Sequence, residues 1–198
     1  MARPQAPHLP ETTQLARLLA WRGAWISMIN MRAAAGQERS RPAPAVPRTV
    51  LYAAEAVVQG GRDGAGRISE GGLDVDLSVP EEMSGNGGPG ANPEQLFAVA
   101  YAASFQSALL GIARARNLDA SGSQITCQVG IGPAGNGGFG LTVSLDLQAP
   151  DMTAVEAADL MARAHERCPY SAATQGNIEV MLTVAGMPLA RAGEAAAC

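Results

Sequence analysis

The sequence contains no lysine: all 14 basic residues among its 198 are arginine, and 18 acidic residues give a formal net charge of -4. Without lysine the chain has neither Schiff-base chemistry nor the phosphate-binding lysine of a Walker motif. A negative chain also lacks the basic excess that is typical of nucleic-acid-binding proteins. We therefore expect no nucleic-acid partner and exclude both lysine-dependent classes of enzyme.

Cysteine and histidine are scarce. Cys127, Cys168 and Cys198 are too few and too scattered for a disulfide scaffold or a four-cysteine zinc site. His8 and His165 leave little for metal catalysis. His165 lies three residues before Cys168, but two ligands do not make a structural zinc site. We interpret His165 as a packed or hydrogen-bonded core residue, assign no role to Cys127 or Cys198, and expect neither a metal nor a cofactor.

Long uninterrupted apolar runs are also missing. The apolar stretch over residues 15–35 is broken by Arg17, Arg22 and Arg32, so it falls short of the roughly 18 residues that a spanning helix needs. Arg22 also lies where a secretory signal would have its apolar core. We expect no membrane span and a cytoplasmic location.

Charge divides the chain unevenly. Residues 1–48 hold seven arginines and two acids, a net charge of +5, whereas residues 49–198 hold seven arginines and sixteen acids, a net charge of -9. Prolines spaced over residues 41–47 predict an extended linker. The sequence thus predicts a basic, proline-containing and poorly ordered extension over 1–48, a domain over 49–186 and a C-terminal tail over 187–198. The extension is either an amphipathic targeting helix or a dispensable terminus.

The domain begins with strand patterns. Two strand-like runs, residues 50–58 and 73–79, flank the glycine-rich segment 60–64, in which Asp63-Gly64 is a turn signal. An opening pair of strands with Arg62 at or near the connection is predicted. The glycine- and proline-rich stretch 84–90 predicts a flexible loop.

A long helix follows. Asn92 is a suitable N-cap, Pro93 fits the first helical position, and Gln95 lies three residues after the cap. Apolar residues then recur at helical spacing to about residue 116. Ser104 lies in the middle of that apolar face.

The second half alternates strands and helices. Residues 125–131 and 139–147 predict a hairpin, so Gly130, Gly132 and Gly135 do not form a dinucleotide-binding motif, which requires a strand followed by a helix. Thr153 and Glu156 form a capping box that opens a helix ending near Pro169. A strand over 177–184 closes the domain.

Several of these segments together resemble the organic hydroperoxide resistance family of the osmotically inducible protein C superfamily. The resemblance covers about residues 51–184 in order. It is carried by Gly60–Gly64, Asn92–Phe97, Tyr101–Phe105, Gly130–Pro133 with Gly137–Gly140, and Cys168–Ser171 with Gly176–Ile178.

The resemblance implies an α+β fold in which β-sheets pack around long central helices of an intertwined homodimer, with active sites at the subunit interface. It also implies a thiol peroxidase that reduces organic hydroperoxides and is itself reduced by a dithiol, such as a lipoylated protein. A peroxidatic cysteine becomes a sulfenic acid and then condenses with a resolving cysteine. Cys168 matches the resolving cysteine, Arg62 the assisting arginine and Glu94 the assisting glutamate.

The chain departs from this pattern at Ser104, which occupies the position of the peroxidatic cysteine. A hydroxyl cannot enter the sulfenic acid pathway, and it is not ionised near neutral pH, whereas a cysteine has a pKa of about 8.5. We expect the chain to be inactive as written. Either the serine was substituted deliberately, or the chain is a natural paralogue that has lost the chemistry.

The surviving residues make chemical sense around a thiolate. An apolar substrate pocket formed by Phe97, Tyr101 and Phe105 would raise the pKa of a thiol, so a fixed positive charge is needed to lower it. Arg62 supplies that charge, and Glu94 holds its guanidinium. Taken singly, each residue also has a purely structural interpretation: a solvated arginine, a helix-start carboxylate and, for Cys168, an inert buried thiol.

Three functions stay open: an inactivated hydroperoxide reductase, a non-catalytic hydroperoxide-binding or sensing paralogue that uses the lone thiol Cys168, and a structural dimer targeted by its extension.

Glu94 and Ser104 are ten residues apart on one predicted helix, about 15 Å along its axis. Because side chains do not comfortably close that gap, we expect an obligate homodimer with sites shared between chains.

Overall fold

The computed structural model describes residues 47–135 and 137–189. Nearly all of the expected extension over 1–48, together with Cys198 and most of the expected tail, lies outside the described residues. The chain divides into two units, residues 1–40 and residues 41–198. The second unit contains every element described below.

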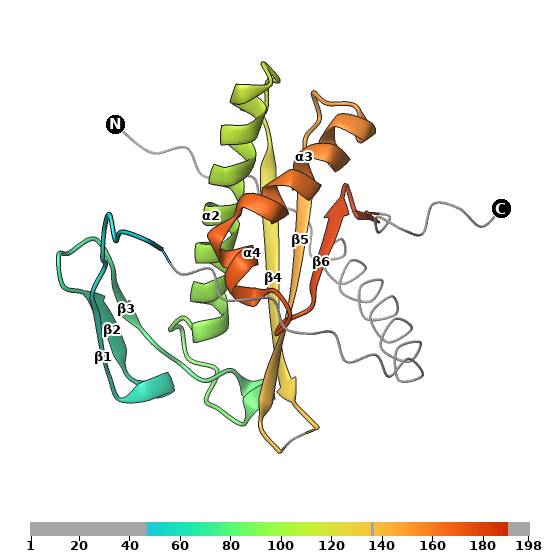
Figure 1. Ribbon diagram of the computed structural model, residues 1–198. Helices are drawn as coiled ribbons and strands as arrows, with labels where there is room; N and C mark the ends of the chain where they lie inside the picture. The colour runs from blue at the N-terminus through green and yellow to red at the C-terminus, as the bar shows by residue number, and fades with distance from the viewer. Residues whose placement is uncertain (1–46, 136, 190–198) are drawn as a thin grey trace, which may run out of the picture. The chain divides into compact units, whose positions relative to one another are not determined.

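The described residues form an α+β fold with two sheets, as expected (Figure 1). A three-stranded antiparallel sheet has the order β1-β2-β3, and a four-stranded mixed sheet has the order β4-β5-β6-β7. The elements are β1 (Ala56–Gln59), η1 (Gly61–Asp63), β2 (Ala65–Ile68), β3 (Asp74–Asp76), η2 (Glu81–Met83), α2 (Pro93–Ala115), β4 (Gln124–Pro133), β5 (Phe139–Gln148), α3 (Ala154–Arg167), α4 (Pro169–Thr174), β6 (Val180–Val184) and β7 (Met187–Pro188).

The four-stranded sheet carries the core. β4 and β5 form the predicted hairpin, in register from Gln124 opposite Gln148 to Pro133 opposite Phe139. β6 runs parallel to β5, so α3 and α4 form the connection that parallel strands require. Val143, Leu145 and Leu147, alternate residues of β5, belong to one core cluster with buried residues of α2 and α3. The buried core comprises Tyr101, Phe105, Leu109, Ala113, Ala120, Val143, Leu145, Leu147, Ala157, Leu160, Met161, Ala164 and Cys168.

The start of α2 is confirmed. The Asn92 side chain accepts from the Gln95 backbone, the Gln95 side chain accepts from the Asn92 backbone, and Pro93 occupies the first turn. The buried residues of α2 fall at four-residue spacing, from Tyr101 to Ala113, so one stripe faces the core. By length and composition, α2 is the one described helix that is apolar and long enough to cross a membrane.

The three-stranded sheet differs from expectation. In place of two strands over 50–58 and 73–79, three shorter strands form, and β2 (Ala65–Ile68) lies in the segment interpreted as the connection. Gly66 lies within β2 and lowers its strand propensity, so the pairing of β2 with β1 and β3 decides the outcome. The predicted position of Arg62 in the turn is confirmed by η1.

Three boundaries in the second half also shift. Pro169 does end α3, but it also occupies the first turn of α4, a position that proline favours. The last predicted strand begins at Val180 rather than at residue 177. β7 lies just past the expected domain end at 186 and pairs with β6. The capping box of Thr153 and Glu156 at the start of α3 is confirmed.

Candidate functional site

Arg62 lies in a turn that only glycine permits. Gly60 has a φ of 81°, in the left-handed region, and a Cβ on Gly64 would lie 1.8 Å from the carbonyl oxygen of Gln59. Side chains at these two positions are therefore excluded. The tight turn places Arg62 on η1, between β1 and β2.

Arg62 binds Glu94 through both arms of its guanidinium. Nη1 donates to Oε2 at 2.8 Å and Nη2 donates to Oε1 at 2.7 Å. These hydrogen bonds hold the pKa of the Glu94 carboxyl below its ordinary value, and the same pairing raises the pKa of Arg62. The Glu94 side chain is 12% exposed and that of Arg62 is 37% exposed. This geometry fixes the guanidinium plane while leaving part of it open to solvent.

Ser104 lies beside Cys168. Its Oγ is 3.5 Å from the Cys168 Sγ, although the two residues are 64 positions apart in the sequence. Cys168 is completely buried and joins α3 to α4. Its backbone N–H donates to the carbonyl oxygen of Ala164 at 2.8 Å. The two positions that the resemblance implies for the cysteine pair are therefore neighbours within one chain.

Aromatic side chains adjoin this pair. The rings of Phe97, Tyr101 and Tyr170 form a cluster with centroids 5.7 to 6.0 Å apart. Tyr101 and Phe105 have no exposed surface and belong to the core, whereas Phe97 is partly exposed. Tyr170 is a member of the cluster that sequence reasoning did not include among the pocket residues. Its place directly after Cys168-Pro169 was the available signal.

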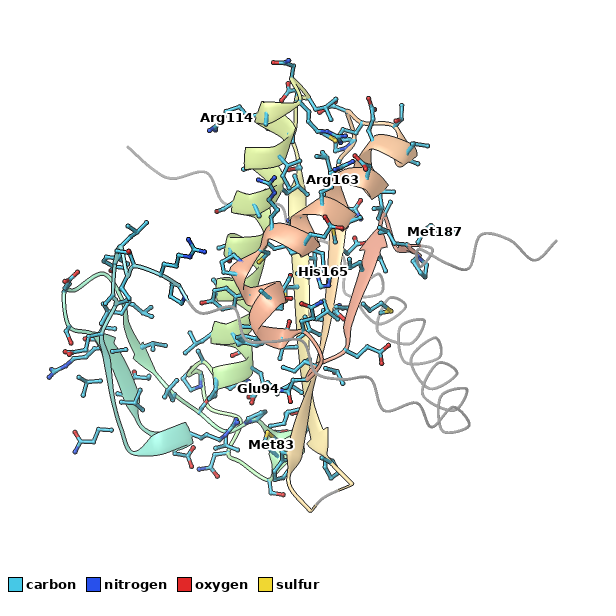
Figure 2. The ribbon with its side chains drawn as sticks, in the orientation of Figure 1. Met83, Glu94, Arg114, Arg163, His165 and Met187 are labelled. Carbon is cyan, nitrogen blue, oxygen red and sulfur yellow. The ribbon has the colours of Figure 1, made fainter. Side chains whose placement is uncertain are left out.

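The two pairs lie apart on α2. Figure 2 shows Glu94 at one end of the helix and Arg114 toward the other. Ser104 is ten residues beyond Glu94, which is about 15 Å along the axis. Within residues 47–135 and 137–189, no hydrogen bond or ion pair joins Arg62 or Glu94 to Ser104 or Cys168. One chain thus holds two pairs with no hydrogen bond or ion pair between them among the described residues, which we call the Arg62–Glu94 half-site and the Ser104–Cys168 half-site.

The remaining candidates hold no metal. Among the described residues, no three histidine, cysteine, aspartate or glutamate side chains are grouped to bind one. His165 is partly buried, burial lowers its pKa, and its Nδ1 has no partner in the described part of the chain. Burial raises the pKa of the Cys127 thiol to about 11, which suits a packed thiol rather than a reactive one.

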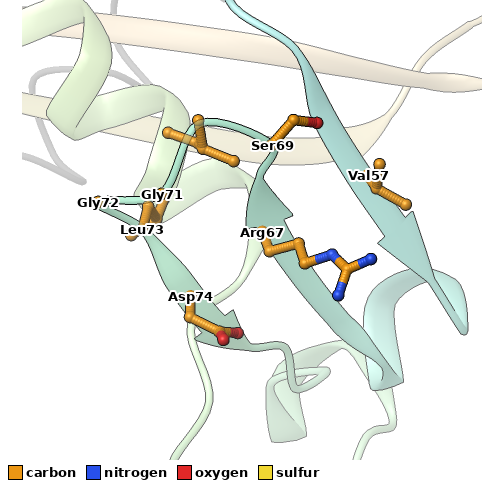
Figure 3. A pocket seen from close by; sticks show the side chains of 8 residues that line it. Val57, Arg67, Ser69, Gly71, Gly72, Leu73 and Asp74 are labelled. Atoms are coloured by element: carbon orange, nitrogen blue, oxygen red, sulfur yellow. The ribbon is translucent and has the colours of Figure 1, made fainter.

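A hollow of about 660 Å³ lies on the three-stranded sheet (Figure 3). Its lining combines exposed apolar side chains, such as Val57 and Leu73, with the charged Arg67 and Asp74. It contains none of the residues predicted for the site.

Comparisons with known proteins show which family this sequence resembles. The family model described as OsmC-like protein matches residues 85–183. The organic hydroperoxide resistance protein of Xanthomonas axonopodis pv. citri (strain 306) is 47% identical over 142 residues, covering 71% of this chain and 99% of that protein. Organic hydroperoxide resistance protein OhrB of Bacillus subtilis (strain 168) is 40% identical over 133 residues, covering 67% of this chain and 96% of that protein.

A solved structure is similar as well. A putative organic hydroperoxide resistance protein from Vibrio cholerae, crystallised with captopril in one of its active sites, superposes with a TM-score of 0.68 at 41% identity. The match covers 72% of this chain and 97% of that one.

Proposed function

This chain belongs to the organic hydroperoxide resistance family of OsmC-like proteins, and from that membership we propose that it has the framework of a cytoplasmic thiol peroxidase for organic hydroperoxides, with Ser104 in place of the peroxidatic cysteine. The observation that carries the proposal is the 3.5 Å separation of Ser104 Oγ and Cys168 Sγ. A thiol in place of that hydroxyl would need to approach Cys168 by only about 1.5 Å to reach the disulfide length of about 2.05 Å.

The chemistry assigns one step to each group. A thiolate at position 104 would attack the outer peroxide oxygen, break the O–O bond and become a sulfenic acid, and the alkoxide that leaves would take up a proton from water to give the alcohol. The Cys168 thiol would then displace that hydroxyl as water, forming a disulfide that a dithiol such as a lipoylated protein reduces. Arg62 would stabilise the thiolate and bind a peroxide oxygen, while Glu94 orients it. Phe97, Tyr101 and Phe105 would provide apolar surroundings for an organic hydroperoxide.

Ser104 itself cannot take the first step. Its hydroxyl is not ionised near neutral pH, and oxygen has no counterpart of the sulfenic acid state. The chain as given is therefore proposed to be inactive, although Arg62, Glu94 and Cys168 are all present.

The apolar surface supports a homodimer. Val99 of α2 is 70% exposed, and six large apolar side chains before and within the three-stranded sheet are between 43% and 96% exposed. Those six are Val50, Leu51, Tyr52, Val57, Val58 and Leu73. Apolar surface of this extent marks an interaction site. A second copy covering it would bring the Arg62–Glu94 half-site of one chain to the Ser104–Cys168 half-site of its partner.

The direct test is Ser104→Cys, assayed with cumene hydroperoxide and dihydrolipoamide. We expect the variant to consume the hydroperoxide and the unaltered chain to consume none. Without the reductant, one equivalent of hydroperoxide should remove both the introduced thiol and that of Cys168. Ser107→Cys is the matched control, because it adds a thiol one helical turn further along α2, where the side chain is exposed. A folded Ser104→Cys variant no more active than this control would refute the proposal.

The second candidate is a binding or sensing protein that uses Cys168. It is favoured by the retention of this thiol beside a hydroxyl that cannot form a disulfide with it. Treating the unaltered chain with cumene hydroperoxide and mapping oxidation by mass spectrometry separates the candidates. Selective, reversible oxidation of Cys168 would support sensing, and an unreacted thiol would exclude it.

A further inference from the structure

Three hydroxyl groups meet inside the hydrophobic core. Tyr101 Oη donates to Ser171 Oγ at 3.0 Å and lies 3.2 Å from Thr174 Oγ1. The exposed fractions of Tyr101, Ser171 and Thr174 are 0%, 2% and 4%. The Thr174 hydroxyl also lies 3.0 Å from the carbonyl oxygens of Tyr170 and Ser171. Phenylalanine at 101, alanine at 171 and valine at 174 would fill nearly the same core volume without buried polar groups. Filling the core therefore does not require these three hydroxyl groups.

What the network adds is a fixed geometry. Each buried hydroxyl has a partner, and leaving one unpaired in the core is costly. The phenol of α2 is therefore tied to two positions of α4, whereas ring packing alone tolerates small shifts. Tyr101 is itself held by the rings of Phe97 and Tyr170. The hydroxyl sets the distance between the two helices at this point.

Backbone hydrogen bonds join Cys168 to both α3 and α4. It is the residue directly before α4, and its carbonyl oxygen accepts from the Ala172 N–H at 3.0 Å. On the other side, its own N–H is bonded to α3 through Ala164. Ser104, in turn, follows Tyr101 by three residues on α2, within one helical turn. The Tyr101 hydroxyl thus links α2, which carries position 104, to α4, which directly follows Cys168.

We propose that Tyr101 is the positioning residue of the resolving step: its hydroxyl, acting through Ser171 and Thr174, holds Cys168 within reach of the group at position 104. This inference rests on the proposed function. In that step the Cys168 sulfur attacks the sulfenic sulfur at position 104, the S–S bond forms, the S–O bond breaks, and the hydroxide leaves as water with the thiol proton. The first step, attack on the hydroperoxide, does not involve Cys168 and should not depend on the Tyr101 hydroxyl.

The test compares the two steps in the Ser104→Cys variant with and without Tyr101→Phe, which removes only the hydroxyl. We expect disulfide formation to slow by about tenfold or more relative to sulfenic acid formation with cumene hydroperoxide, because the substitution keeps the apolar ring and small misplacements of reacting groups have effects of this size. Dimedone should then trap more sulfenic acid. Ser107→Ala is the matched control, because it removes an exposed hydroxyl from the same helix whose hydrogen bond to the Ala103 carbonyl oxygen stays within α2.

Ser171→Ala provides a second route to the same loss, because it removes the acceptor and leaves the tyrosine in place. It should also slow disulfide formation. An unchanged rate of disulfide formation in Tyr101→Phe would overturn the inference, and so would an equal fall in both steps, which would indicate a general loss of structure. Diamide oxidation of the two thiols gives the same comparison without a hydroperoxide. If Ser104→Cys does not react with the hydroperoxide, the proposed function is wrong. The rates of diamide-induced disulfide formation with and without the Tyr101 hydroxyl still decide whether Tyr101 positions Cys168.

Discussion

The two sheets are stabilised in different ways. In the four-stranded sheet, Val143, Leu145 and Leu147 of β5 have no exposed surface, because α2 and α3 cover them. In the three-stranded sheet, all four residues of β1 are exposed, and Val57 and Val58 retain 46% and 58% of their accessible surface. Among the described residues, therefore, one sheet has its own core and the other does not.

This difference also separates the two half-sites. Ser104 and Cys168 lie on elements packed against the four-stranded sheet, so their spacing is set within the chain. Arg62 lies on a turn of the three-stranded sheet, and its guanidinium donates to the Glu94 carboxylate. Under the proposed dimer, whatever covers the small sheet also fixes the guanidinium. Assembly and chemistry would then depend on the same contacts.

The strongest test of the contrast uses one apolar truncation in each sheet. Leu145→Ala should lower the free energy of unfolding by about 3 kcal/mol, because it opens a cavity in a closed core. Val58→Ala should leave that core intact and instead raise the dimer dissociation constant about tenfold, since it removes apolar contact from the association surface. Urea denaturation and sedimentation over a dilution series measure the two effects. Equal, concentration-independent losses of stability would show that the chain covers its own small sheet.

A second prediction concerns the planar guanidinium of Arg62. In the Ser104→Cys background, Arg62→Lys should lower the rate of hydroperoxide consumption by about tenfold or more, because an ammonium is a point charge that does not meet a carboxylate and a peroxide oxygen together in planar geometry. Arg67→Lys, on exposed β2 of the same sheet, should have no effect. Undiminished activity in Arg62→Lys would show that charge alone suffices.

The smallest effect concerns pH. Because Arg62 holds the pKa of Glu94 below its ordinary value, the pair stabilises the fold at pH values above the pKa of an unfolded glutamate, about 4.3. That stabilisation is lost as the pH falls through the lowered pKa. Glu94→Gln should therefore cost stability at pH 7, on the order of 1 kcal/mol or less because Arg62 is partly solvated. The difference from the unaltered chain should vanish in acid, as followed by urea denaturation at each pH. A difference that persists unchanged at low pH would argue against the ion pair.

The sequence predicted those helices and strands that local residue patterns specify. The caps at Asn92 and Thr153 and the alternation of β4 and β5 depend on residues close together in the chain, so α2, α3 and the hairpin were predicted. β2 was not predicted because Gly66 weakens the strand pattern of this short segment and only its two neighbouring strands specify it. α4 was not predicted because a proline after a helix indicates its end, although proline also favours the first turn of a new helix.

The sequence predicted the candidate site only in part, for the same reason. The resemblance supplied Arg62, Glu94, Ser104 and Cys168, and the structure pairs them as two separate half-sites. The Tyr101 hydroxyl network could not be predicted, because Ser171 and Thr174 are 70 and 73 residues away and no periodicity links them. Hydrogen bonds of this kind arise from the packing of whole elements.

The central claim is that a complete site needs the charged half of one chain and a thiol in the other. The most direct measurement mixes the unaltered chain, which has Glu94 but no thiol at position 104, with a chain carrying both Glu94→Ala and Ser104→Cys. The two are unfolded and refolded together, and consumption of cumene hydroperoxide is compared with each chain refolded alone and with Ser104→Cys. We predict that the mixture exceeds the sum of the separate chains, because heterodimers contain one complete site. Activity in the mixture no greater than that sum, in dimers shown to have exchanged subunits, would contradict the shared site.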